Sequence, residues 1–323
     1  MHNVAYPHAL SDQAQPTAEP MCRQLADLVS TRTSEEGLYE TAIPGLNLFR
    51  ADAPTSCMST VYEPSLCVIA QGRETVQLGD REIVYDALSY MVSSVDLPVN
   101  KFVVDASPEN PFLAVKINID PAEVAKVVMQ LGDVHHASEP RGTPDSGCGM
   151  CVAQVDLGIL DAMTRLVRLL DSPDDVPVLA PLIQREIIYR ALVGELGPRM
   201  REFASTDSQS NRISQVISIL KNRFAEPLRV RQLAEDVNMS ESALYHSFKQ
   251  ATCMSPLQFQ KKLRLHEARL LMLKEGLEAS TASYRVGYES PSQFSREYSR
   301  MFGAPPRSDI AKLRGETRVS VPA

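Results

Sequence analysis

Apolar and polar positions follow two different periods along the chain, and the change of period divides it into two parts. Between residues 45 and 119, short apolar runs with a period near two are interrupted by turn residues such as Gly72 and Gly79. Short strands at such regular spacing predict an antiparallel sandwich or small barrel. The predicted strands are residues 66–70, 75–78, 82–85, 90–92, 101–104 and 112–117.

Beyond residue 121 the apolar positions recur with the period of a helix. The pattern predicts helices over 122–130, 157–170 and 180–192, the last with Pro181 in its first turn. Residues 205–210 are polar throughout and read as a linker.

The first of two helix-turn-helix patterns runs from residue 230 to 251. Its first helix has apolar residues at i, i+3, i+4 and i+7, and Ser240 is placed to cap the second helix by accepting a backbone N–H bond. The residues expected to face the core are Val230, Leu233, Ala234, Val237, Leu244, Phe248 and Ala251.

The second pattern repeats this plan over residues 282–302. Gly287 stands where a left-handed residue is needed, and Ser290 is an N-cap followed by Pro291 at the first helical position and a capping-box Gln293. One such pattern is a weak signal, because short helix pairs occur in many cores. Two of them, with second helices centred 50 residues apart, strongly indicate a DNA-binding module.

Charge supports this interpretation. The chain carries −7 overall, but residues 205–323 carry +6 and residues 1–204 carry −13. Positive charge provides the sequence-independent part of DNA affinity through counterion release. A basic DNA-binding module is therefore attached to an acidic module of another kind.

The C-terminal residues also carry a family resemblance. Residues 287–303, followed by Pro305, resemble the C-terminal signature of AraC/XylS-type transcription regulators, and residues 255–256 and 264–269 resemble the long helix that joins the two motifs in that family. The match covers about residues 211–313. It departs at residues 305–308, where the family usually continues with an aromatic-Arg pair after the proline.

The resemblance implies two recognition helices that enter successive major grooves of promoter DNA, with RNA polymerase as a further partner. Grooves on one face of DNA recur about every 34 Å, a separation that a rigid connecting helix can fix. Arg296 suits a guanine edge and Gln293 an adenine edge. The base-reading candidates are Ser242, Tyr245, His246, Ser292, Gln293 and Arg296, and the phosphate-contacting candidates are Lys249, Arg285 and Arg300.

The N-terminal part resembles the cupin-like domain of a subgroup of the same family. Residues 64–66, 71–72, 78–80 and 93–99 carry this likeness, which spans about residues 36–130. It implies a sensor for a small effector, and a barrel interior is a suitable concave, apolar site. The helices after the barrel commonly form a dimer interface in this family. The apolar stripe Leu182, Ile183, Ile187 and Ala191 fits that role or packing against the barrel.

The expected architecture is therefore α+β, with an N-terminal antiparallel cupin-like barrel, a helical extension and an all-α C-terminal domain with two helix-turn-helix motifs. The expected boundaries are a flexible tail at 1–33, the sensor domain at 34–130, a helical linker or dimerisation region at 131–204 and the DNA-binding domain at 205–323. The expected protein is a sequence-specific transcription regulator, an activator and a homodimer. Its signal is a small effector or a thiol or electrophile.

Among six cysteines, Cys148 and Cys151 form a C-x-x-C pair in a Gly- and Pro-rich loop after His135 and His136. Three interpretations stay open: ordinary packing, a redox-sensing thiol pair, or a zinc site with the histidines. The loop lacks the second ligand pair of a usual structural zinc site, so no metal and no cofactor are expected. Cys67 lies in a predicted strand and is expected to pack in the core.

Other classes of function fit poorly. There is no histidine between residues 9 and 134, which argues against a metal-dependent cupin enzyme, and no Gly-rich phosphate loop appears. No signal peptide or membrane span is expected, so the predicted location is the cytoplasm. A broad nucleoid-type DNA-binding protein is the alternative, but it would not need a separate acidic domain.

Overall fold

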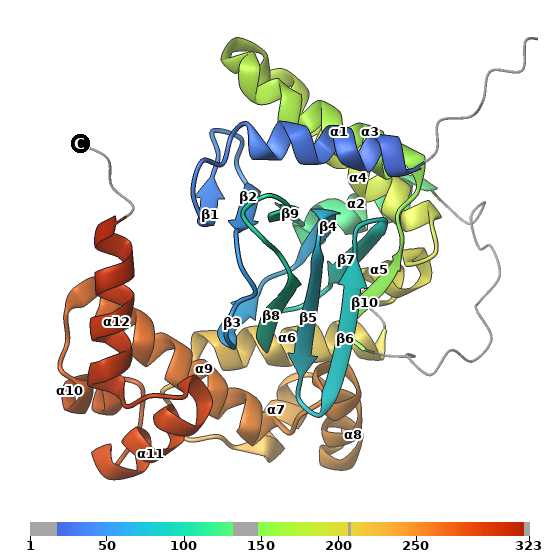
Figure 1. Ribbon diagram of the computed structural model, residues 1–323. Coiled ribbons are helices and arrows are strands. Elements are labelled where there is room, and N and C mark those ends of the chain that lie inside the picture. The colour runs from blue at the N-terminus through green and yellow to red at the C-terminus, as the bar shows by residue number, and fades with distance from the viewer. Residues whose placement is uncertain (1–17, 132–147, 206–207, 320–323) are drawn as a thin grey trace, which may run out of the picture.

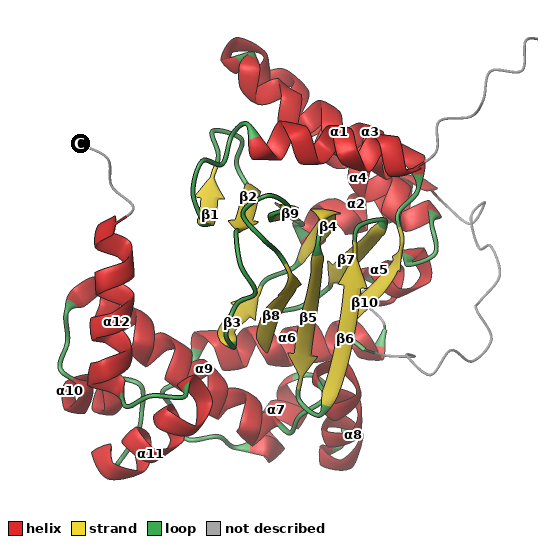
Figure 2. Ribbon diagram, in the orientation of Figure 1, coloured by secondary structure: helices red, strands yellow, loops and turns green. Residues whose placement is uncertain are grey.

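A computed structural model describes residues 18–131, 148–205 and 208–319. A strand-rich module lies between two groups of helices, with the C-terminal helices on one side and α1, α3 and α4 on the other (Figure 1). Figure 2 shows the strands gathered in one block, as an α+β architecture with an antiparallel barrel requires. The fold class inferred from the sequence is confirmed.

Two antiparallel sheets form the barrel. The order is β1-β2-β9-β4-β7-β10 in one sheet and β3-β8-β5-β6 in the other. The strands are β1 Gly37–Glu40, β2 Leu46–Ala51, β3 Met58–Tyr62, β4 Ser65–Gln71, β5 Arg73–Leu78, β6 Arg81–Asp86, β7 Ser89–Ser93, β8 Leu97–Asp105, β9 Phe112–Asn118 and β10 Met150–Gln154.

Strand β4 shows how the barrel is positioned, because both of its faces are covered. Leu66 and Val68 belong to the core between the six-stranded sheet and the helices, whereas Ile69 faces the barrel interior. Successive side chains of a strand point to opposite faces, so one strand contributes to two cores. A continuous apolar run in the sequence follows from this double burial.

The sequence patterns found strands β4 to β9, including β6 at the edge of its sheet, and missed the others. Strands β1, β2 and β3 were not predicted, and β10 lies where a loop was expected. In β10 Cys151 pairs with Val92 of β7 in antiparallel register. Cys148 and Cys151 are consequently buried against the barrel and do not lie in an exposed loop. His135 and His136, named with them, lie outside the described residues.

The expectation of a flexible tail over residues 1–33 is wrong for its second half. Residues Ala18–Ser30 form α1, whose buried side chains are Cys22, Leu25, Ala26 and Val29. This i, i+3, i+4, i+7 spacing gives an apolar stripe that packs on the six-stranded sheet. Residues 1–17 lie outside the described part.

Helices α2 Pro121–Leu131, α3 Leu157–Arg168, α4 Val176–Val193 and α5 Gly197–Ala204 complete the outer layer. The apolar stripe of α4, expected to form a dimer interface or to pack on the barrel, is divided between the buried and the exposed side of the helix. Ile183, Ile187 and Ala191 are buried in the core of the sensor module, while Leu182 is 61% exposed.

The C-terminal module is all helical. Its helices are α6 Gln209–Asn222, α7 Val230–Asp236, α8 Glu241–Thr252, α9 Pro256–Leu270, α10 Ala279–Arg285, α11 Pro291–Phe302 and α12 Pro306–Val319. A single π-helical turn, Leu271–Glu275, follows α9. Within the described ranges no helix is both long and apolar enough to cross a membrane.

Candidate DNA interface

The first helix-turn-helix motif consists of α7, a tight turn and α8. Asn238 adopts a left-handed conformation (φ 54°), and the Met239 amide donates to the Ala234 carbonyl oxygen at 2.8 Å. Ser240 then caps α8, because its hydroxyl accepts a bond from the Ala243 amide at 3.2 Å. The cap inferred from the sequence is confirmed, and it fixes where the recognition helix begins.

The second motif, α10 and α11, turns at Gly287. This residue has φ 87°, and a Cβ atom there would collide with the Ala225 carbonyl oxygen. Ser290 caps α11 as expected, accepting from the Gln293 amide at 3.4 Å. The capping-box role of the Gln293 side chain is wrong, because its amide nitrogen donates instead to Glu297 Oε1 at 3.1 Å.

Each recognition helix buries one face and presents the other. Leu244 and Phe248 of α8 and Phe294 and Tyr298 of α11 are fully buried. All six base-reading candidates are exposed on the opposite faces: Ser242, Tyr245 and His246 on α8, and Ser292, Gln293 and Arg296 on α11. The structure therefore presents both predicted triads to solvent, one on each helix.

The three phosphate candidates differ in their surroundings. Lys249 and Arg300 are exposed in the last turns of their helices. Arg285 forms an ion pair with Glu275 at 2.6 Å, so a phosphate would have to compete with that carboxylate. Their contacts with DNA stay predictions.

Glu297 lies between the reading face of α11 and the connecting helix. Its carboxylate accepts hydrogen bonds from Lys261 at 2.8 Å, Tyr288 at 2.8 Å and Gln293 at 3.1 Å. Burial opposes ionisation of Glu297, but these bonds outweigh it and lower the pKa of the carboxyl group. An ionised Glu297 therefore orients the Gln293 side chain before any DNA is present.

Arg264 of α9 holds the two motifs together. Its guanidinium donates to the carbonyl oxygens of Phe224 at 2.7 Å, Glu226 at 2.9 Å and Gly287 at 2.8 Å. Residues 224–226 precede the first motif and Gly287 is the turn of the second. One side chain thus joins the segment before the first motif to the turn of the second, a role that the sequence patterns did not identify.

The last helix is fixed by a second arginine. Arg269 forms a two-pronged pair with Asp309, at 2.8 and 2.7 Å, and the Tyr298 hydroxyl donates to the same carboxylate at 2.6 Å. These bonds join α9, α11 and α12. Nearby, burial and two cationic neighbours lower the pKa of His266 to about 3, so this histidine is neutral and packs against Phe302.

The sensor module contacts the DNA module on sides away from the reading faces. The Gly149 amide donates to the Ala251 carbonyl oxygen at 2.9 Å, and Lys221 pairs with Asp96 at 2.6 Å. Ser59 donates to the Met301 carbonyl oxygen at 3.3 Å. Both motifs therefore touch the barrel.

The barrel interior contains a cavity of about 180 Å³ with a polar cluster in its wall. Glu74 is buried there, accepts bonds from Tyr85 at 2.7 Å and Tyr62 at 3.2 Å, and lies 3.2 Å from Lys101 Nζ. Its Oε1 atom accepts no hydrogen bond despite the nearby lysine. Cys67, expected to pack in the core, packs against the barrel core and also lines this cavity.

Among the described residues, no group of three or more His, Cys, Asp and Glu side chains could hold a metal ion. The Cys151 thiol donates to the Cys148 carbonyl oxygen at 3.6 Å, and the two side chains are 8% and 3% exposed. A redox role for this pair stays a prediction, and burial makes it depend on an opening of the strand.

Comparison with known proteins agrees with this geometry. A family model described as the AraC-type transcriptional regulator N-terminus matches residues 42–199, and a helix-turn-helix domain model matches residues 233–310. The HTH-type transcriptional activator RhaS of Salmonella arizonae is 27% identical over 161 residues, as is RhaS of Salmonella paratyphi B. Each alignment covers 50% of this chain and 57% of the relative, so the chain spans little more than half the length of these relatives.

Solved structures show a related fold. ToxT from Vibrio cholerae O395 has a TM-score of 0.52 at 9% identity, and apo ToxT from strain SCE256 has 0.52 at 10% identity. Each comparison covers 84% of this chain and 98% of the other. The two family models together include most of the barrel and both recognition helices, and the chain belongs to the AraC/XylS family of transcription regulators.

Proposed function

We propose that this protein is a sequence-specific transcription activator that reads promoter DNA with α8 and α11. The observation that carries the proposal is the arrangement of the two motifs. Their exposed faces carry polar side chains, Arg264 fixes their separation, and their other sides pack on the sensor barrel. RNA polymerase is the partner that an activator at a promoter would contact.

The two helices are expected to contribute unequally to the recognition of bases. Arg296 on α11 is suited to a bidentate contact with guanine, and Gln293 to one with adenine. Glu297 holds one Gln293 N–H and leaves the amide oxygen for a base. Helix α8 offers Ser242, Tyr245 and His246, and its sequence preference should be weaker because it has no arginine or glutamine among these positions.

The signal should reach the protein through the barrel cavity. Glu74 Oε1 is buried and lies 3.2 Å from the Lys101 ammonium without hydrogen-bond geometry, so a donor on a ligand could complete the interactions of this carboxylate. Lys101 and Lys116 also line the cavity. A small molecule with a hydroxyl or amine donor for Glu74 fits this chemistry.

A homodimer is proposed from the outer side of α4. Its exposed apolar side chains are Val178, Leu179, Leu182, Tyr189 and Val193. Exposed apolar patches of this kind mark interaction surfaces. An isologous contact between two α4 helices would cover the patch on both protomers at once.

The function is tested by genome-wide binding of the purified full chain to sheared DNA, followed by footprinting and transcription in vitro with RNA polymerase. Discrete sites that span about two major grooves per protomer, with increased transcript from promoters beside them, are expected. Uniform coating of DNA without preferred sites would instead establish the nucleoid-type alternative.

A further inference from the structure

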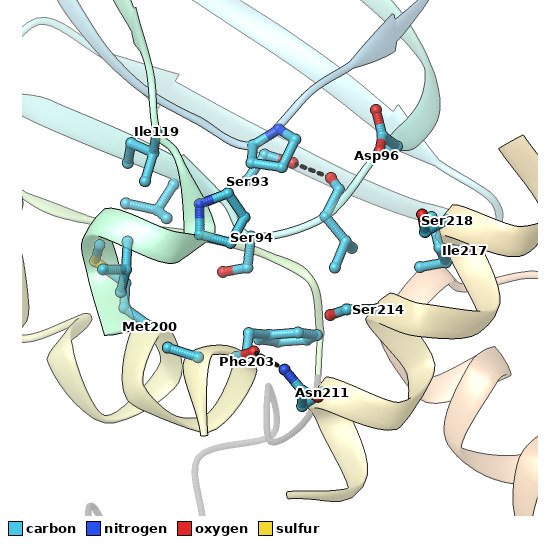
Figure 3. Close-up of a pocket in the computed structure, with 16 residues that line it drawn as sticks. Ser93, Ser94, Asp96, Ile119, Met200, Phe203, Asn211, Ser214, Ile217 and Ser218 are labelled. Carbon is cyan, nitrogen blue, oxygen red and sulfur yellow. Dashed lines mark hydrogen bonds between the residues drawn. The ribbon is translucent and has the colours of Figure 1, made fainter. Parts of the chain in front are cut away.

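A second cavity, of about 320 Å³, lies where the sensor module meets the first helix of the DNA module (Figure 3). Its walls come from the segment between β7 and β8, from α2 and α5, and from α6 of the DNA module. Among the described residues, none lines both this cavity and the barrel interior. Its volume is at the lower end of the range for small-molecule sites.

The walls are mainly apolar with hydroxyl groups at two sides. Val124, Phe203 and Ile217 are buried and supply apolar surface. Ser94 of the sensor module and Ser214 of α6 contribute hydroxyls, and Figure 3 shows the Ser214 hydroxyl directed toward the Phe203 ring. Ser214 already donates to the Ser210 carbonyl oxygen at 3.2 Å, so it can act only as an acceptor for a ligand.

The electrostatics of the cavity exclude a strongly charged occupant. Asp96 is the carboxylate among the lining residues described, and Lys221 neutralises it at 2.6 Å. No lysine, arginine or histidine is among the described residues that line the walls. A charged ligand would lose its hydration without gaining a partner of opposite charge.

We propose that this cavity binds a neutral, mainly apolar small molecule with a hydroxyl or amide donor, and that the ligand holds the sensor and DNA modules in their docked arrangement. The walls belong to both modules, so the complete site exists only when they are docked. A ligand that binds one arrangement better shifts the population toward it. This site is separate from the barrel cavity and does not require that the barrel hold an effector.

The contacts that would gain stability are the other contacts between the two modules. Gly149 and Ala251 are hydrogen-bonded across the same seam, and Gly79 packs so closely on the Cys253 carbonyl group that a Cβ atom would collide with it. Lys221 also lies 3.5 Å from Glu63. The ligand would therefore reinforce a seam that runs from α6 to the end of α8.

The test uses the full chain and the neutral fluorescent probe N-phenyl-1-naphthylamine. A saturable rise in fluorescence is expected, together with slower hydrogen exchange at residues 93–97, 209–218 and 251–254. Ser94→Phe and Ser214→Phe fill the cavity from opposite modules, and each should weaken probe binding by about tenfold or more. Gln215→Phe, on the exposed side of α6, and Thr60→Phe, in the barrel cavity, are the matched controls and should retain binding.

Hydrogen exchange is measured on the parent protein, so it tests the proposal even where a variant fails to fold. The proposal would be overturned if the probe slowed hydrogen exchange only in the barrel strands. It would also be overturned if probe binding were lost in Thr60→Phe and kept in Ser94→Phe. The absence of saturable binding would overturn it as well. DNA binding of the same preparation, measured separately, shows whether the regulator function holds independently of this site.

Discussion

At the scale of single residues, Arg296 and Gln293 show two ways of presenting a side chain to DNA. Gln293 is held by Glu297, at 3.1 Å, and so would meet a DNA groove in one orientation. Arg296 is exposed, and within the described ranges it forms no ion pair. Its guanidinium can therefore turn to a base edge without first breaking a bond within the protein.

Arg296→Ala should weaken binding to the specific operator by ~1–3 kcal/mol, since a bidentate guanine contact is lost. Fluorescence anisotropy titration of operator and scrambled DNA measures the change. Arg23→Ala, an exposed arginine on α1 of the sensor module, should leave both affinities unchanged. Equal loss on operator and scrambled DNA would mean that Arg296 contacts phosphate instead of a base.

Cys67 is a residue whose reactivity follows from its surroundings. Burial, reinforced by the Glu74 carboxylate, raises its pKa to about 11. Little thiolate exists at neutral pH, so iodoacetamide should modify Cys67 slowly at pH 7.5, with a rate that rises toward pH 11. Exposed Cys57 should react first. Mass spectrometry of alkylated peptides across this pH range gives both rates.

Glu74→Gln removes the charge that helps to raise the Cys67 pKa, so alkylation of Cys67 should accelerate in that variant at a given pH. Similar rates for Cys57 and Cys67 in the parent protein at pH 7.5 would contradict this account of the barrel interior.

At the scale of elements, α9 is proposed to set the geometry of DNA reading through Arg264. Arg264→Lys keeps the charge but loses the planar fork that reaches four carbonyl groups. It should reduce the free energy of unfolding by about 1.5–3 kcal/mol. It should also make binding less sensitive to base pairs inserted between the two half-sites, because the motifs are no longer held at one separation.

Arg269→Lys is the matched control, since it weakens the anchor between α9 and α12 without touching the first motif. Chemical denaturation and titrations on a series of operator spacings measure the two effects. If the DNA affinities of Arg264→Lys and Arg269→Lys depend on operator spacing in the same way, Arg264 contributes only to the stability of the fold.

The elements also show what the sequence could establish. Local signals sufficed for both motifs, because a cap such as Ser240 and a left-handed Gly287 act through neighbours in the chain. Strands β4 to β9 were recognisable from runs or alternations of apolar residues. Edge strand β1 buries little of its surface, so it has no such run.

Contacts between distant segments could not be inferred in the same way. Helix α1 was mistaken for tail because the polar residues before it obscured its apolar stripe. Arg264 contacts carbonyl groups about 23 to 40 positions away, and no pattern in the sequence marks a backbone acceptor. Gln293 is a local case that the capping pattern also failed to predict, because its side chain bonds to Glu297 one turn later and not to the cap.

At the scale of the whole molecule, the barrel touches both reading motifs while leaving their exposed faces uncovered. A buried apolar cluster contains residues of both the barrel and the DNA module, and polar contacts add to it: Lys221 with Asp96, Gly149 with Ala251, and Ser59 with Met301. Such an arrangement lets a change in the sensor alter the relative orientation of the motifs without blocking DNA. Regulation through docking follows from this layout more readily than regulation by occlusion.

The proposed homodimer also belongs to the scale of the whole molecule, and α4 is where it should be tested. Leu182 is 61% exposed on the outer side of this helix, between Val178 and Tyr189. Leu182→Glu places a charge in the proposed interface, where it would lose its hydration without a partner. The molar mass measured by light scattering after gel filtration should therefore fall from that of a dimer to that of the 35.7 kDa chain.

Val84→Glu is the matched control, because Val84 is a similarly exposed apolar residue, 53% accessible, on strand β6. It should leave the dimer intact. Since a dimer presents two pairs of recognition helices, Leu182→Glu should also reduce affinity for a site with two operator copies more than for a single copy. A Leu182→Glu protein that keeps the dimer mass would place the interface elsewhere and leave the α4 patch without this role.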